Sequence, residues 1–138
     1  MTDDEKREAV ALELRHASAA LAAARLLCGA ALHNDALSRL YYALFHTMTA
    51  LLLTEGVEPR RHRSMPGLLG TKFAASGLLT AADIAVVSRA ATYRDLADYE
   101  RTWEATSEVT DAAFAEIEPI MVRVRAYLDT NGWLLTAA

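Results

Sequence analysis

The fold is decided by the stretch Asn34-Asp35-Ala36-Leu37-Ser38-Arg39-Leu40-Tyr41-Tyr42-Ala43-Leu44-Phe45-His46-Thr47-Met48. Its apolar residues recur every three or four positions, which is the period of an α-helix. Arg39 and His46 are seven residues apart, so they project from one face, about 10 Å apart along the axis. With Tyr42 between them, they form a second stripe beside the apolar one. A helix with two occupied faces buries one face in a core and turns the other toward a ligand, a partner or a second copy of the chain.

Composition and periodicity predict one all-α domain. The chain has 138 residues, of which 53% are hydrophobic and only 6 are glycine and 3 proline, so it can bury a core without a metal or a disulfide. Alanine and leucine dominate, which favours helices over strands. We expect an up-and-down helical bundle in a single domain of residues 1–138, with its core at about 5–130 and an apolar tail at 131–138. The four long helices are expected at about 3–32, 35–55, 80–94 and from 102–106 to 129, with a short helix at about 65–76 and a polar connection at 94–100.

Charge and cysteine content limit the function classes. The formal net charge is −4, so an RNA contact would need a local basic patch. The one concentrated basic segment, Arg60-Arg61-His62-Arg63, is either a solvated loop or a phosphate-binding edge, because arginine forks fit phosphate oxygens. The single cysteine, Cys28, lies among apolar residues and is expected to be buried, and without a disulfide we expect a cytoplasmic protein. No apolar run approaches the roughly 20 residues of a membrane helix. The four histidines show no metal-ligand spacing, so we expect neither a metal nor another cofactor.

Arg39 and His46 are the residues best suited to chemistry. A neutral imidazole can take the proton of a ribose 2′-hydroxyl as general base, and a guanidinium can hold the scissile phosphate and stabilise the charge that develops on it. Two such helices facing each other across a twofold axis would bring both pairs into one cleft. The spacing is also compatible with a salt-bridged arginine and a histidine packed at a helix interface. His16 and His33 are expected to be surface residues.

Two segments resemble a known family. Ser38-Arg39-Leu40-Tyr41-Tyr42-Ala43-Leu44-Phe45-His46 resembles the signature helix of HEPN domains (higher eukaryotes and prokaryotes nucleotide-binding), in which a histidine follows an arginine after four to six residues. The later Tyr93-Arg94-Asp95-Leu96-Ala97-Asp98-Tyr99 resembles the second signature of small prokaryotic HEPN proteins that are often encoded beside a minimal nucleotidyltransferase. The resemblance covers about residues 5–130. It implies a dimeric helical bundle, metal-independent RNA cleavage by Arg39 and His46, and a toxin–antitoxin pair with the nucleotidyltransferase as antitoxin.

Supporting or phosphate-binding roles fall to Tyr42, Arg94, Asp98 and Tyr99. Tyr42 is either a phosphate ligand or an interface aromatic, and the other three either bond the signature helix and orient Arg39 or form a structural polar network. Active family members often have a polar residue directly after the arginine, where this chain has Leu40. In a class silenced by adenylylation a tyrosine lies two residues after the histidine, where this chain has Met48. The alternative function is therefore a non-catalytic HEPN module that binds a nucleotidyltransferase partner or a nucleotide through the same face.

Overall fold

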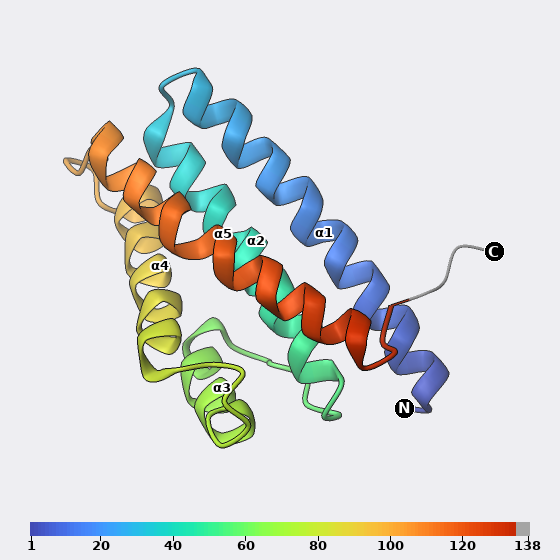
Figure 1. Cartoon of the computed structure of the whole chain (residues 1–138). Coiled ribbons are helices and arrows are strands. Elements are labelled where there is room, and N and C mark those ends of the chain that lie inside the picture. The colour runs from blue at the N-terminus through green and yellow to red at the C-terminus, as the bar shows by residue number, and fades with distance from the viewer. Residues whose placement is uncertain (135–138) are drawn as a thin grey trace.

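The computed structural model describes residues 1–134, which contain five α-helices, one short 3-10 turn and no strand. In chain order they are α1 (Asp3–Gly29), α2 (His33–Leu53), the 3-10 turn η1 (His62–Ser64), α3 (Met65–Phe73), α4 (Ala81–Tyr99) and α5 (Ser107–Thr130). Figure 1 shows the axes of α1, α2 and α5 similarly inclined, with α1 running opposite to α2 and α5, α4 beside them and α3 at one end of the bundle. The predicted all-α bundle of four long helices and one short helix is confirmed.

The helix α2 is the centre of the core. Fourteen of its 21 residues are buried, and α1, α4 and α5 all pack against it. The buried set includes the whole predicted apolar stripe, which consists of Leu37, Leu40, Tyr41, Leu44, Met48, Leu51 and Leu52. The second stripe divides along its length, because Thr49 and Leu53 are buried, Tyr42 and His46 are half-buried, and Arg39 is exposed. Its polar half therefore lies in the N-terminal part of α2, where it reaches solvent.

Local hydrogen bonds explain where two helices begin. Thr80 and Asp83 form a capping box at the start of α4, in which each side chain accepts a hydrogen bond from the other residue's backbone N–H. Neither Asn34 nor Asp35 caps α2, because the helix already begins at His33. The Asn34 amide instead joins α2 to the segment before α5: it donates to the Trp103 carbonyl and accepts from the Ala105 N–H.

The end of α4 departs most from the prediction. We expected this helix to end near Arg94 and residues 94–100 to form a polar connection, but α4 continues to Tyr99. Leu96 and Ala97 are half-buried in this extra turn, and Arg94 forms an ion pair with Asp98 four residues later. Charged residues that look like a loop in the sequence therefore lie on one face of a helix.

The structure also places Cys28 and the start of the apolar tail. Cys28 is half-buried rather than buried, because it lies in the last turn of α1, where the nearby Leu26 is 77% exposed. In the apolar tail, Trp133 lies beneath the Arg7 guanidinium, 5.4 Å from it, so this part of the tail folds back onto α1; Leu135 and the residues after it lie outside the described residues. Among residues 1–134, every helix is too short or too polar to span a bilayer.

Candidate functional site

Arg39 and His46 meet in a groove between α1 and α2, which we call the α1/α2 groove. It has a volume of about 420 Å³ and is lined by His16, Ala19, Ala20, Ala23, Arg39, Tyr42 and His46. The side of the groove formed by α2 is the polar stripe predicted from the sequence. The side formed by α1 is mostly alanine, and these small side chains leave the space open. One copy of the chain is thus sufficient to bring Arg39 and His46 into a common groove.

A carboxylate orients His46. The Nδ1–H of His46 donates to Oε2 of Glu13 on α1 over 2.6 Å, and the two side chains are 27% and 23% exposed. Because a carboxylate only accepts, this bond places the Nδ1 proton and leaves Nε2 as the proton acceptor of a neutral ring. This face of α2 is expected from the sequence to turn toward a ligand, a partner or a second copy of the chain, but α1 of the same chain lies against it and supplies the partner of His46. A histidine held in this way is the usual arrangement of a general base.

Arg39 lies over an aromatic ring. Its guanidinium carbon is 4.8 Å from the centre of the Tyr42 ring, a distance at which the positive charge is attracted to the face of the ring. The Tyr42 hydroxyl in turn accepts a hydrogen bond of 3.0 Å from Nη2 of Arg94 on α4. Arg39 is exposed, so its hydrogen-bond donors can reach an anion in solution.

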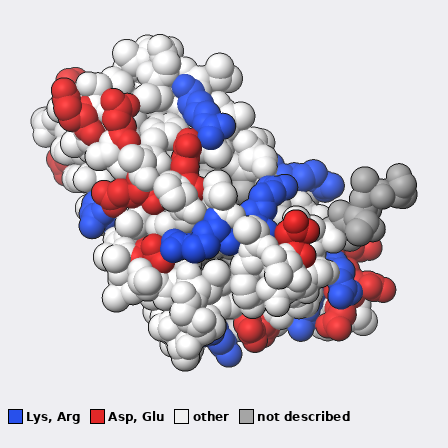
Figure 2. All heavy atoms as spheres, in the orientation of Figure 1, with Lys and Arg blue, Asp and Glu red and all other residues white. Residues whose placement is uncertain are grey.

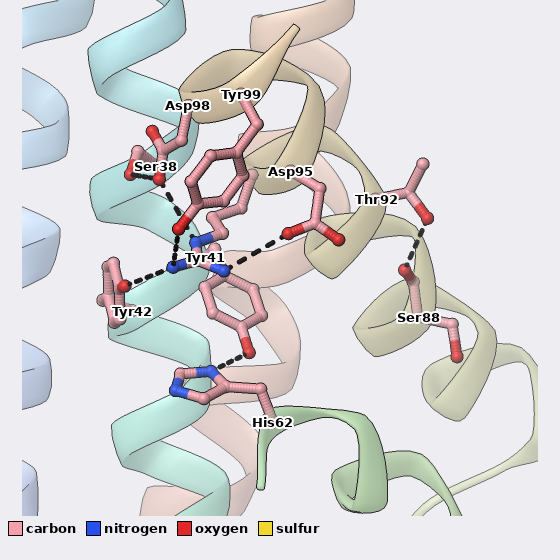
Figure 3. Close-up of polar contacts among 10 residues, drawn as sticks. Ser38, Tyr41, Tyr42, His62, Ser88, Thr92, Asp95, Asp98 and Tyr99 are labelled. Carbon is pink, nitrogen blue, oxygen red and sulfur yellow. Dashed lines mark hydrogen bonds and ion pairs between the residues drawn. The ribbon is translucent and has the colours of Figure 1, made fainter.

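A polar network around Arg94 joins α4 to the signature helix. Figure 3 shows how its members from α2 and α4 converge. Nε of Arg94 lies 3.2 Å from Oδ2 of Asp98, which also accepts a hydrogen bond from the Ser38 hydroxyl. Burial alone would lower the pKa of the guanidinium, but its contacts with Tyr42, Tyr99 and Asp98 outweigh that effect and raise the pKa above its ordinary value.

This network decides how Arg94, Asp98 and Tyr99 relate to Arg39. As anticipated, Arg94 and Asp98 bond the signature helix, and Arg94 also donates to the Tyr99 hydroxyl over 3.4 Å. Within residues 1–134 Asp98 pairs with Arg94 and Ser38, and not with Arg39. The network therefore reaches Arg39 only through the Tyr42 ring.

A second cleft lies beside Arg94, and we call it the Arg94 cleft. Its volume is about 560 Å³, and its lining consists of Tyr41, His62, Arg63, Pro66, Ser88, Ala91, Arg94, Asp95 and Tyr99. The Tyr41 hydroxyl and Nδ1 of His62 share a hydrogen bond. Burial raises the pKa of Tyr41 to about 12, whereas burial and the nearby Arg94 charge lower the pKa of His62. Both groups are therefore neutral near pH 7.

The basic segment does not act as one patch. His62 is exposed but packs against α2, where its ring stacks on Phe45 with centroids 4.1 Å apart. Arg63 lines the Arg94 cleft, whereas Arg60 and Arg61 are exposed and line neither of the two clefts. On the face drawn in Figure 2, Lys and Arg lie interspersed with Asp and Glu. Any contact of this segment with RNA would therefore involve single arginines and not one continuous basic surface.

Two residues of the groove were missed in the sequence. The sequence does not single out Glu13, and His16 is expected only as a surface residue; His16 is exposed, but its ring lies 5.3 Å from the His46 ring, and Glu13 bonds His46. Their spacing of three places both on one face of α1, and this is the signal that could have found them. Within the described residues, no group of three or more His, Cys, Asp or Glu side chains is placed to hold a metal ion.

Comparison with known proteins gives consistent matches over most of the chain. The HEPN domain family model matches residues 10–127. The protein named "Putative toxin MJ0605" of Methanocaldococcus jannaschii is 30% identical over 122 residues, which cover 88% of this chain and 90% of that protein. "Putative toxin MJ0142" of the same organism is 28% identical over 123 residues, or 89% of this chain and 83% of the relative. "UPF0332 protein PH1297" of Pyrococcus horikoshii is 41% identical over 46 residues, about a third of each chain (33% and 32%).

Proposed function

The chain belongs to the HEPN domain family, and we propose that it is the toxin of a toxin–antitoxin pair, a metal-independent endoribonuclease whose antitoxin is of the nucleotidyltransferase type. Two relatives that it matches over most of their lengths carry "Putative toxin" in their names. The observation that carries the nuclease activity is that Arg39 shares the α1/α2 groove with a histidine whose Nδ1 is bound by a carboxylate.

The cleavage step follows from these groups. Nε2 of His46 takes the proton of the ribose 2′-hydroxyl, and the 2′-oxygen attacks the adjacent phosphorus. Arg39 binds the phosphate oxygens and stabilises the additional negative charge of the transition state. The bond from phosphorus to the 5′-oxygen breaks, and this oxygen takes up a proton from a general acid or from water, which gives a 2′,3′-cyclic phosphate and a 5′-hydroxyl. DNA lacks the 2′-hydroxyl, so the substrate class is RNA.

Other residues have supporting roles in this proposal. Glu13 holds the tautomer and orientation of His46, and Tyr42 supports Arg39 from below its guanidinium. Arg94, Asp98 and Tyr99 hold Tyr42 in place as positioning residues. The exposed Arg60, Arg61 and Arg63 lie outside the α1/α2 groove and would contact the RNA backbone only beyond it. A homodimer that pairs two α1/α2 grooves across a twofold axis would form a longer cleft for the strand.

The test is cleavage of RNA by the purified protein in EDTA. His46→Ala and Arg39→Ala should each lower the rate by about 10²–10⁴-fold, the usual contribution of one proton-transfer or charge-stabilising group. Glu13→Gln keeps a hydrogen-bond acceptor but removes the charge, and it should lower kcat by at least about tenfold with little change in KM.

Matched controls are available outside the groove. His33→Ala replaces a histidine on the same helix, about 20 Å from His46 along the axis, and Arg101→Ala replaces an exposed arginine of the loop before α5. Both should cleave at the wild-type rate. Equal activity of the wild type, His46→Ala and Arg39→Ala would refute the nuclease function.

A second candidate function is a non-catalytic module that binds a nucleotidyltransferase-type partner. It is favoured by the complete burial of Leu40 and Met48, because neither position then offers a polar group to the groove. Co-purification of a stable complex, with no RNA cleavage by the free protein or the complex, would support this function over the first.

A further inference from the structure

A second histidine shares the α1/α2 groove with His46. The ring centroids of His16 and His46 are 5.3 Å apart, and the ring planes are tilted by 34°. His16 lies on α1 one turn after Glu13, so the residue that holds His46 and the residue that faces it come from the same side of one helix. The groove therefore contains two imidazoles and one guanidinium beside an alanine-lined space.

We propose that His16 is the general acid of the cleavage step, a catalytic role that rests on the function proposed above. Breaking the bond between phosphorus and the 5′-oxygen leaves an alkoxide, which is a poor leaving group until it receives a proton. The imidazolium form of His16 gives its proton to this oxygen while Nε2 of His46 takes the proton of the 2′-hydroxyl. One proton enters the protein and one leaves it, so the products are a 2′,3′-cyclic phosphate and a neutral 5′-hydroxyl.

The hydrogen bonds of the two rings distinguish their roles. Glu13 occupies Nδ1 of His46, which leaves Nε2 of that ring as the acceptor needed by a base. His16 is exposed, and neither of its ring nitrogens makes a hydrogen bond to any group in residues 1–134. Both nitrogens can thus carry protons, and solvent can reload the ring after each turnover.

The distance between the rings suits a shared phosphate. The attacking and leaving oxygens are bonded to the same phosphorus, so a base and an acid acting on them must lie within a few ångströms of each other. A proton-transfer group has to come within about 2.6–3.2 Å of its oxygen. Two rings with centroids 5.3 Å apart can both meet this condition around one phosphate group. Arg39, which lines the same groove, would bind the remaining phosphate oxygens.

The experiment uses two RNA substrates that differ at one atom. An oligoribonucleotide is compared with the same molecule carrying sulfur in place of the 5′-bridging oxygen at the cleaved bond, since a thiolate leaves without needing a proton. We expect His16→Ala to cut ordinary RNA at least about 100-fold more slowly than the wild type but to cut the sulfur-containing RNA at nearly the wild-type rate. His46→Ala should be impaired on both substrates.

Three results would overturn the role of His16 and leave the proposed function intact. In the first, His16→Ala cuts ordinary RNA at the wild-type rate. In the second, His16→Ala loses the same factor of rate on both substrates. In the third, the sulfur-containing RNA restores the cleavage rate of His46→Ala and not that of His16→Ala. If His46→Ala and Arg39→Ala are as active as the wild type, the proposed function itself fails. His16→Gln serves as a second variant of similar size, and Arg15→Ala is a control at the neighbouring exposed position of α1, with thermal unfolding of each variant to verify its fold.

Discussion

The hydrogen bond between Tyr42 and Arg94 is the link through which α4 reaches the candidate site, and a double-mutant cycle measures it. Tyr42→Phe removes the hydroxyl that accepts from Nη2 of Arg94 over 3.0 Å but keeps the ring beneath Arg39. A hydrogen bond to a charged group is worth about 1.5–3 kcal/mol when buried. Tyr42 is half-exposed, so water replaces part of this bond, and we expect a loss of about 1 kcal/mol in the free energy of unfolding.

The variant Arg94→Met removes more interactions than Tyr42→Phe does. It deletes the contacts to Tyr42 and Tyr99 and leaves the Asp98 carboxylate with Ser38 as its partner. Because the Arg94 side chain is only 19% exposed, we expect a loss of about 3 kcal/mol, between the values for exposed and fully buried ion pairs. The double variant should also lose about 3 kcal/mol rather than the sum of about 4, which is a coupling of about 1 kcal/mol.

Urea unfolding followed by far-ultraviolet circular dichroism gives the four free energies. Tyr127→Phe combined with Arg94→Met is the matched control, because Tyr127 lies on α5 against Phe73, and these two changes should add to within about 0.5 kcal/mol. A coupling below about 0.3 kcal/mol between Tyr42→Phe and Arg94→Met would show that the bond contributes little and would refute the positioning role of Arg94. Tyr42→Leu, which also removes the ring, should reduce RNA cleavage more than Tyr42→Phe does.

Three further predictions test individual contacts. His62 has a lowered folded pKa and faces Arg94, Asp95 and His46. Its contribution to the free energy of unfolding should therefore be complete above its unfolded pKa of about 6.5 and be lost as the pH falls through its folded pKa. Urea unfolding at several pH values measures this loss. The variant His62→Phe should not show it. Burial raises the pKa of Tyr41 to about 12, so one tyrosine should ionise late in an ultraviolet absorbance titration, and stability should fall as the pH rises above the unfolded value near 10. Asn34→Ala removes two hydrogen bonds between α2 and the segment before α5 and should cost about 2 kcal/mol in urea unfolding, whereas no loss would show that water replaces both.

Much of the fold could be predicted because α2 carries an unambiguous apolar period. The stripe from Leu37 to Leu52 is buried as expected, and the capping box of Thr80 and Asp83 starts α4 at the predicted position. The end of α4 could not be predicted in the same way. Arg94 and Asp98 have the composition of a loop, and their helical setting depends on Tyr42 and Ser38, which lie more than fifty residues away in the sequence.

The site was predicted in part for a similar reason. The sequence places Arg39, Tyr42 and His46 on one face of a helix, and the structure brings all three to one groove. The sequence does not show which helix forms the other side of this groove, so a second copy of the chain was expected there. The helix α1 forms that side, with Glu13 bonded to His46, while dimerisation stays a prediction.

The register of α1 explains why one helix can supply both core and site. Its buried residues include Val10, Leu14 and Ala17, and successive residues of a helix are rotated by about 100° about its axis. Glu13 and His16 each precede a buried residue by one position, so they lie at the edge of the buried face rather than on the opposite one. At that edge a side chain contacts α2 and still reaches solvent, which a carboxylate and an exposed imidazole both require. A periodicity analysis assigns such edge positions to the surface, because their polarity is typical of the surface. Only the packing of α1 against the polar stripe of α2 identifies them as part of a site.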